Sequence, residues 1–297
     1  MKHAIITGAT SFVGLELTKR LMENDVETHV IKRPQSDISR FDDLPSYPRL
    51  HDYDGTVASL QSAFTMSQAD TVFHIAGKYA RTHQTADIDP LIEANLRFGT
   101  HILEAMSTSK QARYLINTGS YFQYYDSLEP RAVNLYAALK NAFADILDYY
   151  CDATDIYALT LVLFDTYGPG DWRHKLMTAV RDAQKTGASL PVPGEDLELD
   201  FVYVDDVVDA FIYAARFLKS ETIPLHHSYA VSSGAPLRIS QLIKKFESIG
   251  NRSIDVEHGK WPPQNRIIST PWQGACLPGW TPKITIDEGI HRLLESP

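Results

Sequence analysis

The chain has few of the features that mark secreted, membrane-bound or nucleic-acid-binding proteins. Its 297 residues include only two cysteines, Cys151 and Cys276, so a disulfide framework is not expected. No apolar run is long enough to span a bilayer, and the apolar start of the chain is too short for a signal peptide. The formal net charge is −9 without a basic stripe, which argues against nucleic acid or a membrane as a partner. These absences predict a cytoplasmic protein.

The sequence also lacks internal repeats, low-complexity tracts and metal-ligand clusters. The 11 histidines are scattered, and the adjacent His226 and His227 have no recognisable ligand spacing, so we expect no metal site. The remaining composition, 44% hydrophobic and 22% charged, is that of an ordinary globular protein. A chain of this length can bury a large core, as one domain or as two unequal domains.

Apolar segments typical of buried strands alternate with helical segments through the first half of the chain. The expected strands are 4–7, 27–31, 71–77, 114–120 and 157–164, and the expected helices run from a glycine turn to about 24, from 89 to 106 and from 134 to 150. This alternation predicts an α/β fold with a doubly wound parallel sheet. Ligands of such sheets bind beyond the carboxyl ends of the strands.

A glycine-bearing turn follows the first expected strand and leads into a helix. Free N–H groups and the helix dipole make such a turn an anion site, so it predicts dinucleotide binding, although an ordinary strand–turn–helix is the alternative. Gly8 would serve the tight turn, Gly14 would let the helix pack closely on the strand, and Ser11 stands where a glycine would admit the pyrophosphate. The cofactor-binding candidates here are Gly8, Thr10, Ser11, Phe12, Val13 and Gly14.

The second expected strand ends in Lys32-Arg33. An acidic residue at this position binds the ribose 2′-hydroxyl of NAD, whereas a basic residue suits the 2′-phosphate of NADP. Both side chains can pair with phosphate and neither can accept a hydrogen bond, so NADPH is the expected cofactor and NAD the second choice. The alternative is a solvated loop charge. Asp52, expected in a loop, is a weaker candidate for covering the adenine.

Tyr136 and Lys140 lie four positions apart on an expected helix, one above the other on the same face. The phenol would protonate the alkoxide that forms when a carbonyl is reduced, and the ammonium would lower the pKa of the phenol. The pair alone also occurs by chance. Thr118 and Ser120 end the strand at 114–120, where a hydroxyl can hydrogen-bond the same substrate oxygen.

Taken in order, these motifs resemble the extended short-chain dehydrogenase/reductase family, in its nucleoside-diphosphate-sugar branch of epimerases, dehydratases and 4-ketoreductases. The resemblance covers almost the whole chain and rests on segments 7–14, 74–77, 95–100, 117–118, 136–140, 164–171 and 201–207. It implies a Rossmann domain at 1–167, completed by about 200–225. A smaller C-terminal substrate-binding domain is expected at 168–199 and 226–297, where proline and glycine increase.

The resemblance also implies residue roles. Tyr136 matches the general acid/base, Lys140 the lysine that binds the nicotinamide ribose, and Thr118, or Ser120 if the strand end is offset, the hydroxyl that polarises the sugar carbonyl. Further cofactor contacts are expected from Ala76, Gly77, Lys78 and Asn95. A homodimer through the helices that carry Asn95 and Tyr136 is what the family implies.

Contacts to a nucleotide sugar are expected mainly in the second half of the chain. Arg173, Lys175 and Arg266 are candidates for pairing with a diphosphate, although each is as well explained as a solvated cation. Leu190 and Val192 belong to an extended segment similar to one that packs on the nucleotide base in relatives. The remaining substrate-binding candidates are Lys78, Ser120 and Tyr121.

The resemblance favours NADPH-dependent reduction of the 4-keto group of a nucleoside-diphosphate-linked deoxyhexose. The motifs are most similar to the CDP-3,6-dideoxyhexose reductases that make abequose or paratose, which implies deoxysugar and lipopolysaccharide biosynthesis. Dehydration is not expected, because Gly119-Ser120 stand where 4,6-dehydratases carry an Asp-Glu pair. Two alternatives stay open: an NAD-dependent 4-epimerase, and a non-catalytic dinucleotide-binding regulator. Lys32 and Arg33 favour the reductase over the epimerase, since epimerases of this branch retain NAD.

Overall fold

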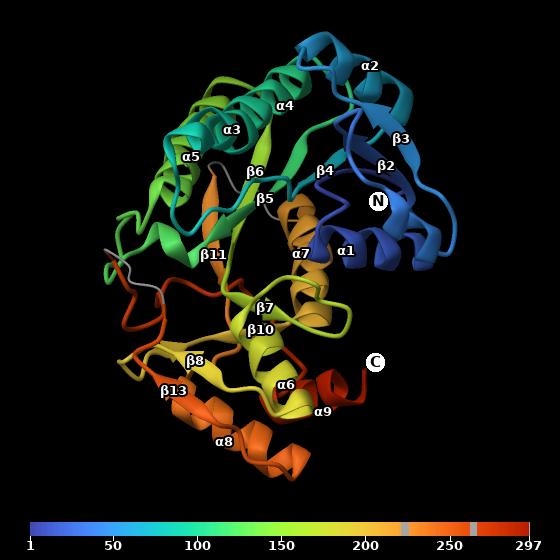
Figure 1. Cartoon of the computed structure of the whole chain (residues 1–297). Coiled ribbons are helices and arrows are strands. Elements are labelled where there is room, and N and C mark those ends of the chain that lie inside the picture. Colours follow the sequence, from blue (N-terminus) through green and yellow to red (C-terminus); the bar gives the residue numbers. More distant parts are fainter. Residues whose placement is uncertain (221–225, 262–265, 297) are drawn as a thin grey trace.

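A seven-stranded parallel sheet forms the centre of the protein in the computed structural model, which describes residues 1–220, 226–261 and 266–296 (Figure 1). Its strand order is β11-β6-β5-β4-β1-β2-β3, and each neighbouring pair is parallel. The predicted doubly wound α/β fold is therefore confirmed. The strands are β1 His3–Thr7, β2 Glu27–Lys32, β3 Arg49–Asp52, β4 Thr71–His74, β5 Tyr114–Ser120, β6 Tyr157–Leu163 and β11 His227–Val231.

Helices cover both faces of the sheet. α1 Phe12–Glu23 and α7 Val204–Ser220 pack on one face, where they contribute to the larger apolar cluster with β5 and β6. α2 Val57–Ser67, α4 Phe98–Ser107 and α5 Leu135–Ala153 cover the other face. A parallel sheet needs such cover because both faces of its strands are apolar.

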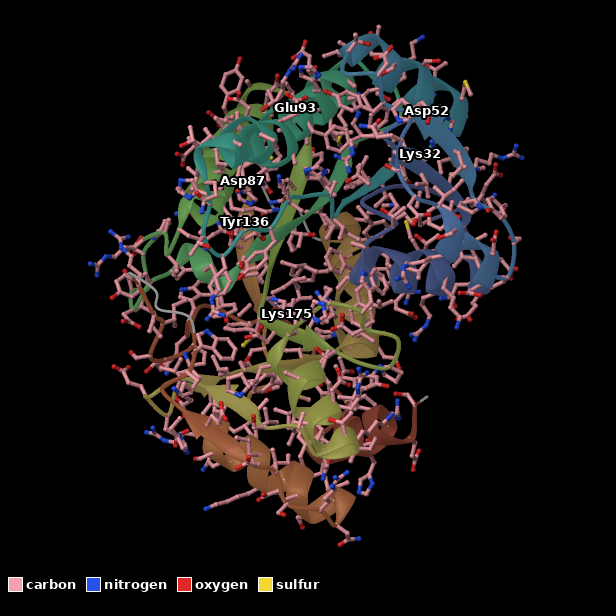
Figure 2. All side chains as sticks on the ribbon, viewed as in Figure 1. Lys32, Asp52, Asp87, Glu93, Tyr136 and Lys175 are labelled. Atoms are coloured by element: carbon pink, nitrogen blue, oxygen red, sulfur yellow. The ribbon has the colours of Figure 1, made fainter. Side chains whose placement is uncertain are left out.

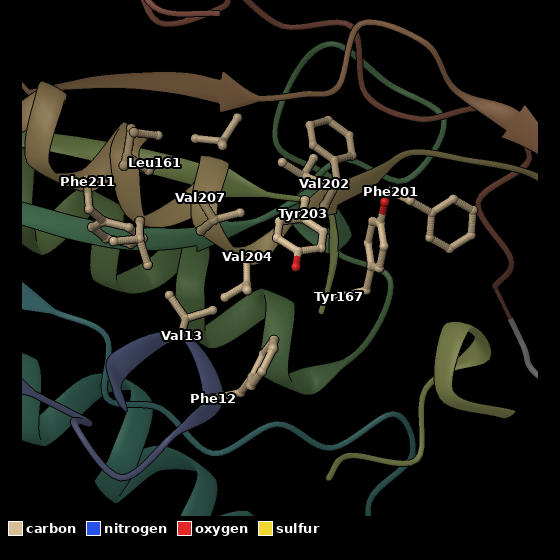
Figure 3. Close-up of a cluster of buried hydrophobic side chains, with 14 of the residues drawn as sticks. Phe12, Val13, Leu161, Tyr167, Phe201, Val202, Tyr203, Val204, Val207 and Phe211 are labelled. Carbon is tan, nitrogen blue, oxygen red and sulfur yellow. The ribbon is translucent and has the colours of Figure 1, made fainter. Parts of the chain in front are cut away.

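The cluster between α1, α7 and the neighbouring strands fixes the start of α1. Figure 3 shows Phe12 and Val13 against Val204 and Val207 of α7, with Tyr167 and Tyr203 beside them. All of these side chains are buried. The turn that precedes α1 is therefore anchored on the core side and leaves its main chain for other contacts.

The helix expected at 89–106 is divided into three parts. α3 Ile88–Ile92 is followed by a π-helical turn, Glu93–Arg97, and then by α4. The π-helical turn carries Asn95, which is buried under the loop after β4. Such turns insert one residue into a helix and often occur at functional sites.

Shorter elements lie below the sheet in Figure 1 and come from two stretches of the chain. They are β7 Asp165–Tyr167, α6 Leu176–Thr186, β8 Leu190–Val192, β9 Glu198–Leu199, β10 Phe201–Tyr203, β12 Leu237–Arg238, α8 Ile239–Gly250, β13 Val256–His258 and α9 Ile286–Glu295. They form the two-stranded pairs β7–β10, β9–β12 and β8–β13.

The predicted division into domains stays a prediction, with one observed difference. β11 belongs to the segment 226–297 that the sequence assigns to the substrate domain, but it pairs with β6 in the main sheet. Its buried residues Ala230 and Val231 give it the apolar character of a sheet strand. The last residues of the predicted 200–225 segment lie outside the described residues.

Candidate active site

The turn between β1 and α1 brings two stretches of backbone into close contact. Gly8 has a φ of +73°, and a Cβ there would lie 2.6 Å from the main-chain nitrogen of Ala76, just after β4. A Cβ on Gly14 would lie 2.1 Å from the carbonyl oxygen of Gly8. Only glycine fits either position. The tight turn and the close helix–strand contact predicted for these residues are therefore present.

Ser11, the departure from the expected glycine pattern, is the N-cap of α1. Its hydroxyl accepts a hydrogen bond from the N–H of Gly14 at 3.2 Å and donates one to the carbonyl of Gly8 at 2.7 Å. The first turn of α1 has no acidic residue, so the positive end of the helix dipole is not neutralised there. The turn thus fits the diphosphate of a dinucleotide, with the serine stabilising the helix start.

Phe12 and Val13 can contact a ligand only through their main chain. Their side chains are 2% and 6% exposed and point into the core (Figure 3). Thr10 is half-buried in the same turn. Phe12 and Val13 can therefore contribute only backbone N–H groups to a bound cofactor.

At the end of β2, the structure differs from the prediction that Lys32 and Arg33 are both available to bind a 2′-phosphate. Lys32 is not a free cation, because its Nζ donates a hydrogen bond to Oδ1 of Asp52 at 2.6 Å (Figure 2). The register of β2 and β3 places the two residues opposite each other, and Asp52 ends β3 instead of lying in a loop. Arg33 is exposed next to this pair and is left as the candidate for a 2′-phosphate.

Asn95 holds the loop after β4. Its Oδ1 accepts a hydrogen bond from the N–H of Lys78 at 3.2 Å, and its Nδ2 donates to the carbonyls of Lys78 and Leu91 at 2.9 Å each. A Cβ on Gly77 would lie 2.9 Å from the same Oδ1. Asn95 therefore fixes the loop of Ala76, Gly77 and Lys78 beside the glycine turn, and Lys78 extends to Asp87, 3.3 Å away.

α5 brings Tyr136 and Lys140 to the carboxyl end of β5. Asn134 caps this helix by accepting a hydrogen bond from the N–H of Ala137 at 3.0 Å. Lys140 is only 5% exposed, and its Nζ donates to the main-chain carbonyl of Thr118 at 2.7 Å. The predicted tyrosine–lysine pair therefore faces the strand end on which the predicted hydroxyls lie.

The two hydroxyls at that strand end are not equivalent. Ser120 lies close enough to Tyr136 for its hydroxyl to lower the pKa of the phenol. The hydroxyl oxygen of Thr118 is buried and has no hydrogen-bond partner among the described residues. Of the two alternatives that the sequence leaves open, the structure brings Ser120 to the tyrosine.

Burial determines the pKa values of the catalytic candidates. It raises the pKa of Tyr136 to about 12, against the smaller opposite effect of Ser120. Burial also lowers the pKa of Lys140 to about 8. The predicted lowering of the phenol pKa by the lysine is wrong for this arrangement, because the ammonium is directed at the carbonyl of Thr118.

Two aromatic neighbours of Tyr136 were missed by the sequence analysis. Tyr79 packs edge-on against Tyr136, with ring centroids 5.3 Å apart, and Phe122 stacks on Tyr79 at 5.9 Å. Tyr79 is 44% exposed, so it borders the catalytic tyrosine from the solvent side. Its position directly after Lys78, beyond the end of β4, is the signal that would have identified it.

A charged pair lies below these rings. The Nζ of Lys175 is 4.7 Å from the ring centroid of Tyr79 and 3.9 Å from Oδ1 of Asp165. The hydroxyl of Tyr121 donates to Oδ2 of the same carboxylate at 2.9 Å. Of the predicted substrate contacts, Lys175 therefore lies near the catalytic tyrosine, whereas the hydroxyl of the buried Tyr121 is already bonded.

A family model described as the NAD dependent epimerase/dehydratase family matches residues 4–226, which include the glycine turn, Ser120, Tyr136 and Lys140. The chain belongs to this family. It is therefore an NAD(P)-dependent enzyme of the extended short-chain dehydrogenase/reductase type.

Curated relatives of this family include two kinds of enzyme. CDP-abequose synthase of Salmonella muenchen is 24% identical over 297 residues, which cover 99% of this chain and 97% of that protein. CDP-abequose synthase of Yersinia pseudotuberculosis is 27% identical over 210 residues, 70% of this chain and 71% of that protein. UDP-glucose 4-epimerase of Mycolicibacterium smegmatis is 23% identical over 325 residues, 99% and 97% of the two chains.

Solved structures of the family have the same fold. UDP-glucose 4-epimerase of Thermus thermophilus, in complex with NAD, matches with a TM-score of 0.82 at 20% identity, over 99% of this chain and 98% of that one. The Thermotoga maritima UDP-glucose 4-epimerase with UDP-glucose matches with a TM-score of 0.85 at 17% identity, over 99% and 97%. None of the helices in the described part of this chain has the length and apolar character needed to cross a membrane.

Several substrate contacts expected from the family are arranged differently here. Arg173 is held internally, because its guanidinium donates to both carboxylate oxygens of the buried Asp171 and to the carbonyl of Thr166. Leu190 and Val192 are each 2% exposed, with side chains inside the core. A buried carboxylate needs a paired cation, so the first role of Arg173 is to neutralise Asp171. Leu190 and Val192 can therefore contact a nucleotide base only through their main-chain groups.

Arg266 lies in a different place from Lys175. It lines a cavity of about 220 Å³ beside the start of α5, together with Arg81 and His83. Its guanidinium donates to the carbonyl of Ala132 and lies 5.5 Å from the ring of Tyr125. The sequence analysis missed Arg81 and His83, which give this cavity its basic character.

Proposed function

We propose that this enzyme uses NADPH to reduce the 4-keto group of a nucleoside-diphosphate-linked deoxyhexose, with a CDP-4-keto-3,6-dideoxyhexose favoured. The observation that carries the proposal is the convergence of Tyr136, Ser120 and Lys140 at the sheet edge that also holds the glycine turn. The similarity to CDP-abequose synthases over nearly the whole chain supports the choice of substrate.

In this proposal Tyr136 is the proton donor. Its pKa of about 12 keeps the phenol protonated at neutral pH, which is the form that a reductase needs. Ser120 lies against the phenol and holds the same carbonyl oxygen, so both hydroxyls stabilise the negative charge that develops on it. Bound NADPH would supply the hydride. We assign the polarising role to Ser120 in place of Thr118.

In this proposal Lys140 holds the nicotinamide ribose, through its position and its charge. Its ammonium is fixed by the Thr118 carbonyl one helical turn below Tyr136, where a nicotinamide ribose would meet it. The dinucleotide is placed across Gly8, the N-terminus of α1 and the Asn95-held loop, with its nicotinamide end toward Tyr136. These contacts orient the reactants and take no part in bond-making.

The activity is tested by incubating the purified protein with CDP-4-keto-3,6-dideoxyglucose and either NADPH or NADH. We expect consumption of NADPH in step with formation of a CDP-dideoxyhexose that has a new C4 hydroxyl. UDP-glucose with NAD⁺ serves as the epimerase substrate in a parallel reaction. Formation of UDP-galactose, without net consumption of cofactor and without reduction of the keto sugar, would overturn the reductase in favour of the 4-epimerase.

The 4-epimerase is the second candidate because Asp52 neutralises Lys32 and so weakens one argument for NADP. We expect Arg33→Ala to weaken NADPH binding about tenfold, in line with the loss of a charged hydrogen-bonded pair, and to leave NADH binding unchanged. Calorimetric titration of both cofactors measures this. Lys19→Ala, which changes an exposed cation on α1, is the control. Equal affinities for NADPH and NADH in the unaltered protein would contradict the assignment.

A homodimer through α5 and the helix that carries Asn95 remains a prediction. Ile92 and Tyr149 are exposed on these helices, 38% and 65% respectively, and such large apolar side chains are typical of a protein interface.

The third alternative is a non-catalytic regulator. Such a protein would not need Tyr136, Ser120 and Lys140 to lie together.

A further inference from the structure

Three side chains with metal-ligating atoms meet at the amino ends of β1 and β2. This is the end of the sheet opposite to the glycine turn. Nδ1 of His3 lies 3.5 Å from Oε2 of Glu27, and Nε2 of His29 lies 3.4 Å from Oε1 of the same carboxylate. The three ligand atoms are all within 4.8 Å of one another. In the described part of the chain this is the one group of three such residues.

Both imidazole nitrogens that face Glu27 lack a hydrogen-bond partner. Nδ1 of His3 and Nε2 of His29 are buried atoms that no donor or acceptor satisfies within the described residues. His29 as a whole is only 2% exposed, so water does not reach its ring freely. A buried unpaired polar atom is costly, so two of them directed at one carboxylate indicate a missing ligand.

His51 orients the His29 ring. Nδ1 of His29 and Nε2 of His51 are 2.9 Å apart, and the two rings stack with their centroids 5.2 Å apart. When Nδ1 of His29 carries the proton of this hydrogen bond, the lone pair of its Nε2 points toward Glu27. Metal-ligating histidines are held in this way, with the second ring nitrogen donating to a neighbouring group.

The spacing matches that of a small divalent ion. Zinc binds imidazole nitrogen and carboxylate oxygen at about 2.0–2.1 Å in a tetrahedron, which separates neighbouring ligand atoms by roughly 3.3 Å. The two observed separations, 3.5 Å and 3.4 Å, are close to this value and too long for good hydrogen bonds.

Arg49 is the one feature that opposes a cation. Its guanidinium donates a hydrogen bond to Oε1 of Glu27, and its charge lowers the affinity for a metal ion. A carboxylate has about four lone-pair sites, so Glu27 can ligate a metal through its other positions while the arginine fixes its orientation. The Glu27 side chain is 42% exposed, which gives an ion a route from solvent.

We propose that His3, Glu27 and His29 bind one Zn²⁺ ion, with water as the fourth ligand. The ion ties β1 to β2 at the amino end of the sheet and has no part in the reaction. The sequence analysis expected no metal site because these residues are scattered at positions 3, 27 and 29. The β1–β2 register, in which His3 is opposite Glu27 and Ile5 opposite His29, brings them together.

The test uses full-length protein without an affinity tag, since a histidine tag would itself bind metal. Zn²⁺ affinity is measured by competition with a chromophoric chelator, and Co²⁺ is used as a spectroscopic probe of ligand geometry. We expect one equivalent of Zn²⁺ to bind, with visible Co²⁺ absorption of tetrahedral intensity. We also expect Zn²⁺ to raise the unfolding temperature as its concentration increases.

His3→Ala and Glu27→Gln change partly exposed ligands and leave the buried His29 in place, so both variants should fold. Each should lose at least about tenfold in Zn²⁺ affinity and lose the tetrahedral Co²⁺ spectrum. His291→Ala, an exposed histidine on α9, is the matched control and should behave like the unaltered protein. Weak binding without a tetrahedral spectrum, or unchanged affinity in both ligand variants, would overturn the proposal. NADPH binding should be the same in all variants, which keeps this test separate from the proposed function.

Discussion

Tyr136→Phe should lower the turnover number by about 10²–10⁴-fold, the range that one general acid contributes. The change removes a single oxygen and leaves the ring to pack against Tyr79, whose centroid is 5.3 Å away. With the phenol absent, Ser120 can still hold the carbonyl oxygen but cannot replace an acid at this position. NADPH affinity should stay nearly unchanged, because the assigned cofactor contacts lie on the glycine turn, the Asn95-held loop and Lys140.

Turnover is measured as the initial rate of NADPH oxidation at saturating keto sugar, and binding by calorimetric titration. Tyr149→Phe is the matched control, because this tyrosine lies on the same helix and is 65% exposed. The control should keep full activity. If the Tyr136 variant retained most of its turnover, the proton donor would have to be another group, with Tyr79 as the next candidate.

Gly14→Ala should be the most destabilising single-methyl change in the cofactor turn. The added Cβ would lie 2.1 Å from the carbonyl oxygen of Gly8, and both partners of this clash are backbone. Relief requires α1 to move away from β1, against the packing of Phe12 and Val13 on α7 (Figure 3). We expect a loss of about 3 kcal/mol or more in the free energy of unfolding. This corresponds to roughly 6 °C or more in unfolding temperature.

Thermal unfolding followed by circular dichroism, together with NADPH titration, checks this expectation. The displaced helix start should also weaken dinucleotide binding, since its N–H groups would no longer face the turn. Gly194→Ala is the control, because the atom nearest to its added Cβ is 3.8 Å away. An unfolding temperature for Gly14→Ala equal to that of Gly194→Ala would show that the helix–strand contact is looser than described.

Features that depend on neighbours in the sequence were predicted well. The glycine turn and the placement of Tyr136 and Lys140 on one helix both follow from spacing within a few residues. The parallel sheet also follows, because alternating strands and helices leave little choice of topology. For such features the sequence contains nearly all the physical information that is needed.

Features that depend on contacts between distant residues were not predictable in the same way. The pairing of Lys32 with Asp52 follows from the β2–β3 register, which the pattern of apolar residues does not specify. The choice of Ser120 over Thr118 depends on where α5 docks on β5. Both features concern charged or polar groups whose partners are brought together only by the fold.

Arg173 shows a different limit, because its partner is close in sequence. Asp171 is two residues away, but the salt bridge is fixed because that carboxylate is 3% exposed and must be paired. The sequence analysis named Arg173 as a candidate for a diphosphate or as a solvated cation, and did not consider a pair with Asp171. Burial of the aspartate, and not its distance along the chain, was the missing information.

The route of the chain below the sheet has a consequence for synthesis on the ribosome. β8 is completed by β13, which follows it by more than sixty residues, and α6 packs against α8 from the same later stretch. When residues 165–203 leave the ribosome, β13 and α8, which pack against β8 and α6, have not yet been made. The nascent sheet of β1 to β6 can form earlier, because its strands follow one another directly. The lower elements therefore reach their final packing last, after α9 has emerged.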